Sequence, residues 1–269
     1  MVKENTVRKL EVRNCIINFR MERWANKTAV VTGASAGIGA AICLGLANAG
    51  LSVVGLARRP ELIDKLKEDV TGTGRIQSRK CDVSETDEIR LSFEWVVDNF
   101  GGVDVLVNNA GALFNSGNMT DIGDNKISDK DLLATIDVNL KAVVMCTRYA
   151  VASMKKRKFD GYVININSIA GHYIPFRSGF NIYPSTKHAV SAFTSSLLNE
   201  LADCKSKIKV TSLSPGLVNT KMTQHHSTAE EVPILQPSDI ADAVLYLLST
   251  PPYVNITELT VMSVAEKKL

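Results

Sequence analysis

Short runs of apolar residues alternate with amphipathic segments along most of the chain. Most of the runs are rich in valine and isoleucine, which favours strands at 28–32, 52–57, 75–80, 103–109, 161–168 and 207–214, with a weak run at 258–263. Between them, apolar residues recur with helical spacing at 38–49, 61–70, 85–99, 131–156, 185–203 and 238–248. Strands separated by helices predict βαβ units around a parallel sheet. The expected fold class is therefore α/β, a single doubly wound Rossmann domain of about seven strands spanning 21–269.

The beginnings of three helices can be placed from the local sequence. Ser84 precedes the segment ETDE and Ser238 precedes DIAD, so both serines are expected N-caps. Pro184 disfavours helical geometry at Tyr183, and the third helix is therefore expected to begin at Pro184.

Composition and charge are those of an ordinary globular protein. Of the 269 residues, 45% are hydrophobic and 22% are charged. The net charge of +3 comes from residues 1–20, which hold five basic and two acidic side chains, and the rest of the chain is neutral. A neutral body carries no electrostatic footprint for nucleic acid, so no nucleic-acid partner is expected. Residues 1–20 are expected to form a loosely ordered extension.

One segment has the length of a membrane span. No charged residue occurs from Thr28 to Ala57, and thirty such residues could cross a bilayer. Six glycines interrupt this run, however, and its pattern changes from strand to helix and back to strand. Strands buried on both faces of a parallel sheet have this appearance. We therefore favour a soluble strand–helix–strand unit over a transmembrane span.

The cysteines indicate a reducing compartment. All five are widely spaced and none forms a C-x-x-C pair, so neither a disulfide framework nor a zinc site is predicted. We expect a cytoplasmic protein without a metal ion.

A glycine-rich turn follows the first predicted strand. The segment Thr32–Gly39 reads T-G-A-S-A-G-I-G and opens a helix. Glycines allow a tight turn and a close approach of the backbone to a ligand. The free N–H groups and the positive dipole end of the following helix suit a pyrophosphate. The alternative is an ordinary tight turn, but the position between strand and helix favours dinucleotide binding.

The end of the second strand distinguishes the two common dinucleotides. An NAD site places Asp or Glu there, whereas an NADP site has Arg. Here the sequence is Leu56-Ala57-Arg58-Arg59-Pro60, which predicts NADP(H) as cofactor. Arg58 is the expected ligand of the 2′-phosphate, assisted by Arg59 and Ser35. The alternative is that the arginine pair is a solvated surface turn.

Three residues form a candidate catalytic group. Tyr183 and Lys187 are four apart, so they share one helix face. A nearby ammonium stabilises a phenolate, and we expect it to lower the tyrosine pKa and make Tyr183 a general acid/base. Ser168 ends a predicted strand, in reach of the same substrate oxygen.

These motifs together resemble the short-chain dehydrogenase/reductase family from Met21 to about Thr250, with Asn108-Asn109-Ala110-Gly111, Asn139 and Pro215–Thr220 completing the match. The resemblance implies that Tyr183 is the proton donor or acceptor, that Lys187 binds the nicotinamide ribose, and that Ser168 orients the substrate. It implies that Asn139 holds a proton-relay water. The further cofactor contacts that it implies are Gly33, Ala34, Ser35, Gly37, Ile38, Gly39, Asp82, Val83, Asn109, Ala110, Gly111, Pro215, Gly216, Val218 and Thr220.

Three other segments, 21–24, 165–172 and 248–251, are similar to the subgroup of insect farnesol dehydrogenases and vertebrate carbonyl and keto-steroid reductases, which favour NADP. The extension 1–20 and the polar insert 115–130 depart from that subgroup. Apolar residues between Ser168 and Tyr183 indicate a pocket for a small hydrophobic alcohol or carbonyl compound, unless most of them are core or interface residues. The expected substrate contacts are Ser168, His172, Ile174, Phe176 and Tyr183.

Two functions remain open. The first is an NADP-dependent oxidoreductase that interconverts a hydrophobic alcohol, such as a farnesol-like isoprenoid or a steroid, and its aldehyde or ketone. The second is a non-catalytic NADP-binding redox sensor or scaffold. Such a protein could lose Tyr183, Lys187 or Ser168 freely, yet all three are present, which favours the enzyme. The family resemblance also implies a homodimer or homotetramer formed through helices 131–156 and 185–203.

Overall fold

A computed structural model describes residues 21–114, 119–123, 126–174, 180, 182–224, 234–264 and 266. The expected extension 1–20, the candidate substrate contact Phe176 and part of the insert 115–130 lie outside the described residues.

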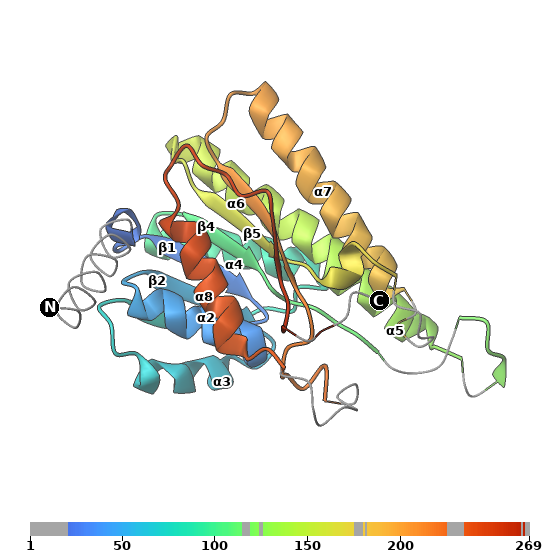
Figure 1. Cartoon of the computed structure of the whole chain (residues 1–269). Helices are drawn as coiled ribbons and strands as arrows, with labels where there is room; N and C mark the ends of the chain where they lie inside the picture. The colour runs from blue at the N-terminus through green and yellow to red at the C-terminus, as the bar shows by residue number, and fades with distance from the viewer. Residues whose placement is uncertain are drawn as a thin grey trace, which may run out of the picture.

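The centre of the molecule is a parallel sheet of seven strands (Figure 1). The strands are β1 (Thr28–Thr32), β2 (Ser52–Ala57), β3 (Arg75–Lys80), β4 (Val105–Asn108), β5 (Tyr162–Ile166), β6 (Lys209–Pro215) and β7 (Glu258–Val261). Their order is β3-β2-β1-β4-β5-β6-β7, and every neighbouring pair is parallel. The predicted fold class, a doubly wound Rossmann sheet of about seven strands, is confirmed.

Helices cover both faces of the sheet. One face carries α2 (Gly37–Asn48), α3 (Pro60–Lys65) and α8 (Pro237–Ser249), and the other carries α4 (Thr86–Phe100), α6 (Ala142–Arg157) and α7 (Tyr183–Asp203). Helix α5 (Asp129–Ile136) packs against α7. Short 3-10 turns lie at η1 (Glu22–Trp24), η2 (Leu66–Asp69) and η5 (Ile169–Gly171), and a π-helical turn, η4 (Asp137–Lys141), joins α5 to α6.

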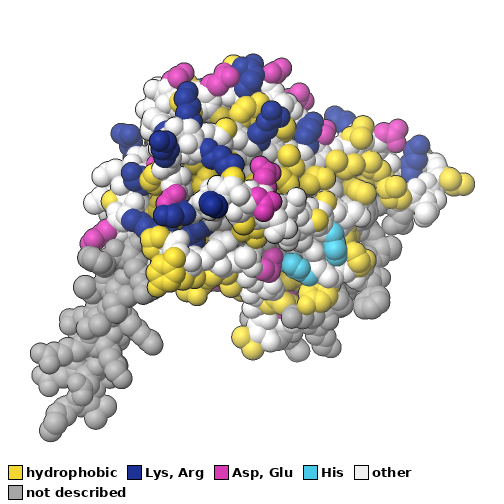
Figure 2. Space-filling view, turned by 90° about the horizontal axis from the view of Figure 1, so that it is seen from above, with side chains coloured by type: hydrophobic (Ala, Val, Ile, Leu, Met, Phe, Trp, Pro, Cys, Tyr) yellow, Lys and Arg dark blue, Asp and Glu magenta, His cyan; other side chains and the backbone are white. Residues whose placement is uncertain are grey.

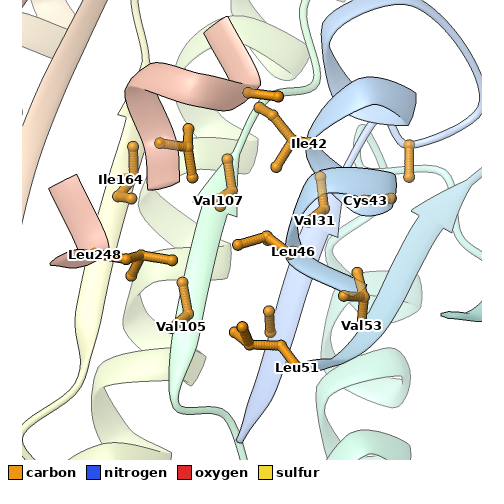
Figure 3. Packing of buried hydrophobic residues seen from close by; sticks show 14 of the residues in the cluster. Val31, Ile42, Cys43, Leu46, Leu51, Val53, Val105, Val107, Ile164 and Leu248 are labelled. Carbon is orange, nitrogen blue, oxygen red and sulfur yellow. The ribbon is translucent and has the colours of Figure 1, made fainter. Parts of the chain in front are cut away.

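Alternate strand residues supply two separate cores, one on each face. Val31, Val53 and Val107 pack against Ile42 and Leu46 of α2 (Figure 3). Their sequence neighbours point the other way, toward α4, α6 and α7. Both faces are buried because crossover helices lie on each side, which explains why the central strands contain so few charged residues.

The uncharged run from Thr28 to Ala57 folds as β1, α2 and β2, as predicted. Within the described part of the chain, no helix has both the length and the apolar character that a membrane crossing requires.

Several helix boundaries differ from the sequence-based predictions. The single helix expected at 131–156 is divided by the π turn η4. The expected caps are wrong: Glu85 is the N-cap of α4, and α8 is capped by Gln236 and Asp239, because Pro237 fixes the first helical position ahead of Ser238. Helix α7 begins at Tyr183 rather than Pro184, since a proline is tolerated anywhere in the first turn, where its missing N–H has no partner to lose.

Candidate active site

A cavity of about 610 Å³ opens at the carboxyl ends of the strands, where the strand order reverses between β1 and β4. This is the usual ligand position in a doubly wound sheet, and the volume is in the range of small-molecule sites. The following residues of the sequence-based prediction line it: Gly33, Ser35, Gly37, Ile38, Arg58, Arg59, Asp82, Val83, Asn109, Ala110, Gly111, Tyr183, Lys187 and Thr220.

The glycine-rich turn is locked against the end of β4. Gly33 has a φ of 67°, and a Cβ there would lie 2.8 Å from the Cα of Ala110, so only glycine fits. Thr32 Oγ1 accepts hydrogen bonds from the backbone N–H groups of Asn109 and Ala110, each at 3.0 Å. Asn109 Nδ2 donates in return to the Thr32 carbonyl at 2.9 Å. These bonds hold the turn open as a cradle beside the cavity.

The first turn of α2 faces this cradle. Its N-cap residue, Ala36, is extended and supplies no side-chain hydrogen bond, so the side chain leaves the first N–H groups of the helix available. Ser35, Ala36, Gly37 and Ile38 all line the cavity. A helix N-terminus with free N–H groups behind a glycine turn fits a phosphate group. The residues present therefore fit a dinucleotide.

Two cations mark the end of β2. Arg58 and Arg59 both line the cavity, and the charge of Arg58 acts on Asp82, which follows β3. Burial opposes ionisation of Asp82, but hydrogen bonds from Ser84, together with Arg58, hold its pKa below the ordinary value. Ser84 donates to Asp82 Oδ1 from its backbone N–H at 3.0 Å and from its hydroxyl at 2.7 Å. The Asp82 carboxylate is thus fixed by Ser84, and Arg58 provides positive charge at the cavity wall.

Tyr183 and Lys187 line the same cavity, and Ser168, which is not itself a lining residue, lies beside Tyr183. Tyr183 is the first residue of α7, and Lys187 lies one turn later, with its Nζ 5.7 Å from the centre of the Tyr183 ring. Lys187 Nζ donates to the carbonyl of Ile166, the last residue of β5, at 3.0 Å. Ser168 follows β5 and forms a hydrogen bond with the Tyr183 side chain. The predicted catalytic residues are therefore neighbours in space.

The ionisation of this group differs from the prediction. Desolvation raises the pKa of Tyr183, and the hydrogen bond with Ser168 only partly opposes that rise. Burial also lowers the pKa of Lys187, to about 8. The expected lowering of the tyrosine pKa is wrong for the chain by itself, because the Lys187 ammonium is directed at the Ile166 carbonyl and is itself poorly solvated. Tyr183 is consequently a neutral phenol at neutral pH.

Asn139 lies in the π turn η4 and is completely buried. Its Oδ1 accepts from the Ala112 N–H at 2.7 Å, and its Nδ2 donates to the Ala112 carbonyl at 2.9 Å and to Thr186 Oγ1 at 3.2 Å. The side chain thus ties the loop after β4 to the turn of α7 that carries Lys187. It lies behind the cavity wall rather than in it.

Comparison with known proteins agrees with this arrangement. The family model described as short chain dehydrogenase matches residues 27–231. The chain belongs to the short-chain dehydrogenase/reductase family. Farnesol dehydrogenase of Aedes aegypti is 47% identical over 250 residues, which cover 92% of this chain and 100% of the relative. Dehydrogenase/reductase SDR family member 11 of Mus musculus is 38% identical over 252 residues, which cover 89% and 95% of the two chains. The resemblance found in the motifs is confirmed.

Solved structures of the family have the same fold. A metagenomic short-chain oxidoreductase in complex with NADP has a TM-score of 0.74 and 30% identity, with 90% of this chain and 99% of that chain covered. An alcohol dehydrogenase of Thermococcus sibiricus, complexed with 5-hydroxy-NADP, has a TM-score of 0.77 and 29% identity, with coverage of 90% and 98%. This short-chain dehydrogenase/reductase is therefore an oxidoreductase related to farnesol dehydrogenase.

Several expected cofactor contacts stand behind the cavity wall of this short-chain dehydrogenase/reductase. Ala34 packs against Gly55, and a Cβ added at Gly55 would lie 2.9 Å from the Cβ of Ala34. Val218 forms a β-bridge with Leu235. The same holds for Gly39, Pro215 and Gly216, none of which lines the cavity. These positions shape the turns that carry the lining residues.

Two expected substrate contacts, His172 and Ile174, are not among the residues that line the described cavity. His172 Nε2 lies 3.0 Å from Ser214 Oγ and 3.1 Å from Glu258 Oε1, which joins the segment after Ser168 to β6 and β7. Ile174 is exposed.

The apolar lining residues that the sequence-based prediction missed include Phe114, Ala134, Val138 and Met222. They come from the loop after β4, from α5, from η4 and from the loop after β6. Phe114 and Val138 are close in sequence to the motif residues Gly111 and Asn139. This proximity could have identified them as residues that line the cavity. On the helical segments, an apolar side chain that lines a cavity has the same pattern as one in the core.

Proposed function

We propose that this chain is an NADP(H)-dependent oxidoreductase that interconverts a hydrophobic alcohol and its aldehyde or ketone. The observation that carries the proposal is that one continuous cavity joins the glycine cradle and Arg58 to Tyr183 and Lys187. A chain that only sensed a dinucleotide would have no use for a neutral phenol and a buried ammonium in the same cavity.

The cofactor part of the proposal rests on charge and backbone geometry. The cradle at Gly33 and the N-terminus of α2 would hold the pyrophosphate, and Arg58, with Arg59 and Ser35, would hold the 2′-phosphate. The alternative, a solvated arginine turn, is less favoured because Arg58 lies at the cavity wall within electrostatic range of Asp82. The two structural neighbours described above contain NADP or a derivative of it. When bound, the nicotinamide ring supplies or accepts the hydride at the substrate carbon.

Tyr183 would move the proton. In carbonyl reduction its hydroxyl donates the proton to the substrate oxygen as the carbon gains a hydride, and alcohol oxidation reverses both transfers. Ser168, already bonded to Tyr183, would share the substrate oxygen. Lys187 would stabilise the phenolate that remains and bind the ribose, and Asn139 would keep α7 in register with the loop after β4. The family resemblance further implies that Asn139 holds a water molecule that relays the proton.

The substrate part of the proposal rests on apolar side chains of the cavity lining. Phe114, Ala134, Val138 and Met222 are among the lining residues, so a hydrocarbon chain in contact with them would be desolvated. The relative from Aedes aegypti is named as a farnesol dehydrogenase. We therefore place a farnesol-like isoprenoid first, followed by a steroid or another hydrophobic carbonyl compound.

A nicotinamide absorbance assay tests the proposal. The purified chain is supplied with NADPH and a panel of ketones and aldehydes, or with NADP⁺ and farnesol, retinol and steroid alcohols. We expect turnover that favours the apolar members of the panel. Tight NADPH binding without turnover of any member would instead support the redox sensor or scaffold.

A further inference from the structure

The end of the chain returns to the loop that follows β6. After β7, the Glu266 N–H donates to the Ser263 carbonyl at 3.1 Å, which forms a turn. From this turn the Glu266 carboxylate reaches the loop, and its Oε1 accepts from the Leu217 N–H at 2.7 Å. Its Oε2 accepts from the Ser263 N–H at 3.3 Å. One side chain near the C-terminus thus connects two backbone segments.

Gly216 makes room for this carboxylate. A Cβ at Gly216 would lie 2.1 Å from Glu266 Oε2, so any larger residue would have to displace the carboxylate. The Gly216 N–H also donates to the Val261 carbonyl of β7 at 2.8 Å. The absence of a side chain at this position is therefore explained by Glu266, since Gly216 itself does not line the cavity.

The loop held in this way forms part of the cavity wall. Asn219, Thr220, Lys221 and Met222 line the cavity and lie only two to five residues beyond Leu217. On its far side the loop is attached through Leu235, whose N–H donates to the Leu217 carbonyl at 3.1 Å and whose carbonyl accepts from the Asn219 N–H at 2.8 Å. Leu217 is thus the point where the cavity loop receives a bond from each side.

We infer that Glu266 is a positioning residue for the cofactor, which acts by fixing the backbone of the loop 216–222. A hydrogen bond to an ionised carboxylate is stronger than one between neutral groups, so its loss would free the loop at Leu217. Cofactor binding would then have to order Thr220 and its neighbours in the cavity wall, and the entropy cost of that ordering would lower the affinity for the cofactor. This inference rests on the proposed NADP(H) site.

The test measures binding and turnover in the full chain. Glu266→Ala is expected to raise the Kd and KM for NADPH about tenfold, because a small misplacement of a binding loop has effects of that order or larger. The kcat at saturating NADPH and the melting temperature without cofactor are expected to stay at the wild-type values. Hydrogen exchange at the Leu217 amide should become faster. A purely structural role would lower the melting temperature and leave the ratio of KM to kcat unchanged.

Three further single variants and one double variant separate the effect of the Glu266 contact from that of its surroundings. Glu266→Gln keeps an acceptor oxygen for Leu217 and is expected to restore most of the affinity. Val264→Ala, on the same turn but fully exposed, is the matched control and should behave as wild type. Gly216→Ala should reproduce the Glu266→Ala defect, and the double variant should be no worse than either single one.

The outcomes distinguish the inference from the function on which it rests. If wild-type protein fails to bind NADPH, both are overturned. If wild type binds NADPH and Glu266→Ala binds it equally well, the inference alone is overturned. If Glu266→Ala and Gly216→Ala have fully additive effects, the carboxylate does not act through the space above Gly216 and the inference is again overturned.

Discussion

Burial and hydrogen bonding have opposite effects on the pKa of Tyr183. Their balance decides whether this residue more readily donates a proton or accepts one. Desolvation raises its pKa and the hydrogen bond with Ser168 lowers it, with desolvation the larger effect. Lys187 has a lowered pKa of about 8, so its charge begins to be lost just above neutral pH. A neutral phenol beside a partly charged amine is ready to give a proton to a carbonyl. It must lose a proton before it can accept one from an alcohol.

The pH profile should show this asymmetry. Because the pKa of Tyr183 is raised, we expect kcat/KM for carbonyl reduction to stay level through neutral pH and to fall only in alkaline solution. For alcohol oxidation we expect kcat/KM to rise with pH. Steady-state rates of reduction and oxidation from about pH 6 to 10 check both pH dependences. Reduction that accelerates with pH would contradict the neutral phenol.

Removing the Tyr183 hydroxyl tests its role directly. Tyr183→Phe should bind NADPH but lose roughly 10²–10⁴-fold in turnover, as for removal of a general acid/base.

Arg58 is the residue on which the choice of cofactor depends. Arg58→Ala should weaken NADP⁺ binding about tenfold or more, since a hydrogen bond to a charged group contributes about 1.5–3 kcal/mol, and it should change NAD⁺ binding little. Titration calorimetry with both dinucleotides measures the difference. Arg59→Ala is the neighbouring control and should have a smaller effect, because we assign Arg59 an assisting role. Equal losses for NADP⁺ and NAD⁺ would refute the assignment of Arg58.

At the scale of elements, the sequence predicted best those helices, strands and turns whose conformation is set by neighbouring residues. The strands and the glycine turn at Gly33 were placed well, because valine-rich runs and positive φ angles leave clear patterns. The π turn at Asp137–Lys141 was missed, since one widened turn hardly alters the spacing of apolar residues along 131–156. The serine caps failed because the Ser84 hydroxyl bonds to Asp82 instead of the helix, and because Pro237 fixes the first position of α8 ahead of Ser238. The inward turn of Phe114 depends on contacts that local sequence does not encode.

The β1–α2 turn provides a test with a matched control. Gly33 and Gly101 both have positive φ angles, but a Cβ at Gly101 would meet nothing within 4 Å. Gly101→Ala should therefore cost only the conformational penalty of about 1–2 kcal/mol in unfolding free energy. Gly33→Ala adds a clash with Ala110, so we expect a loss of about 2–5 kcal/mol. It should also weaken NADPH binding, which Gly101→Ala should not. Chemical denaturation and cofactor titration provide the two measurements.

At the scale of the whole molecule, charge is buried far from the cavity as well. Lys209, the first residue of β6, is buried beneath the Tyr162 ring, with its Nζ 4.5 Å from the ring centre and bonded to Thr250 Oγ1. Burial, and secondarily the charge of Arg23, lower its pKa from 10.5 to about 8. Below pH 8 both the folded and the unfolded chain carry this charge, and the folded chain bears the cost of burying it.

Lys209→Met should expose that cost. Between pH 8 and 10.5 the unfolded wild-type chain binds more protons than the folded one, so its unfolding free energy rises with pH. The variant lacks this rise. We expect Lys209→Met to be more stable than wild type at pH 7, with a difference that shrinks toward pH 10.5. Urea unfolding across this range is the measurement, and a difference independent of pH would contradict the burial of a charged amine.

Assembly of the molecule stays a prediction. Partly buried hydrophobic residues line α6 and α7, among them Tyr149, Phe193 and Leu198. Figure 2, which looks down on the molecule from the top of Figure 1, shows hydrophobic side chains among charged ones on the surface seen from above. The family resemblance implies a homodimer or homotetramer through these helices, and these residues are compatible with it.

The strand order has one further consequence. Residues 28–80 supply β1, β2 and β3, and residues 105–261 supply β4 to β7, so the two halves of the sheet meet along a single seam between β1 and β4. The cavity straddles that seam, with Gly33 and Arg58 on one side and Asn109 and Tyr183 on the other. A ligand that grips both sides opposes their separation. Proteases that cut partly opened chains should therefore digest the protein more slowly when NADPH is added.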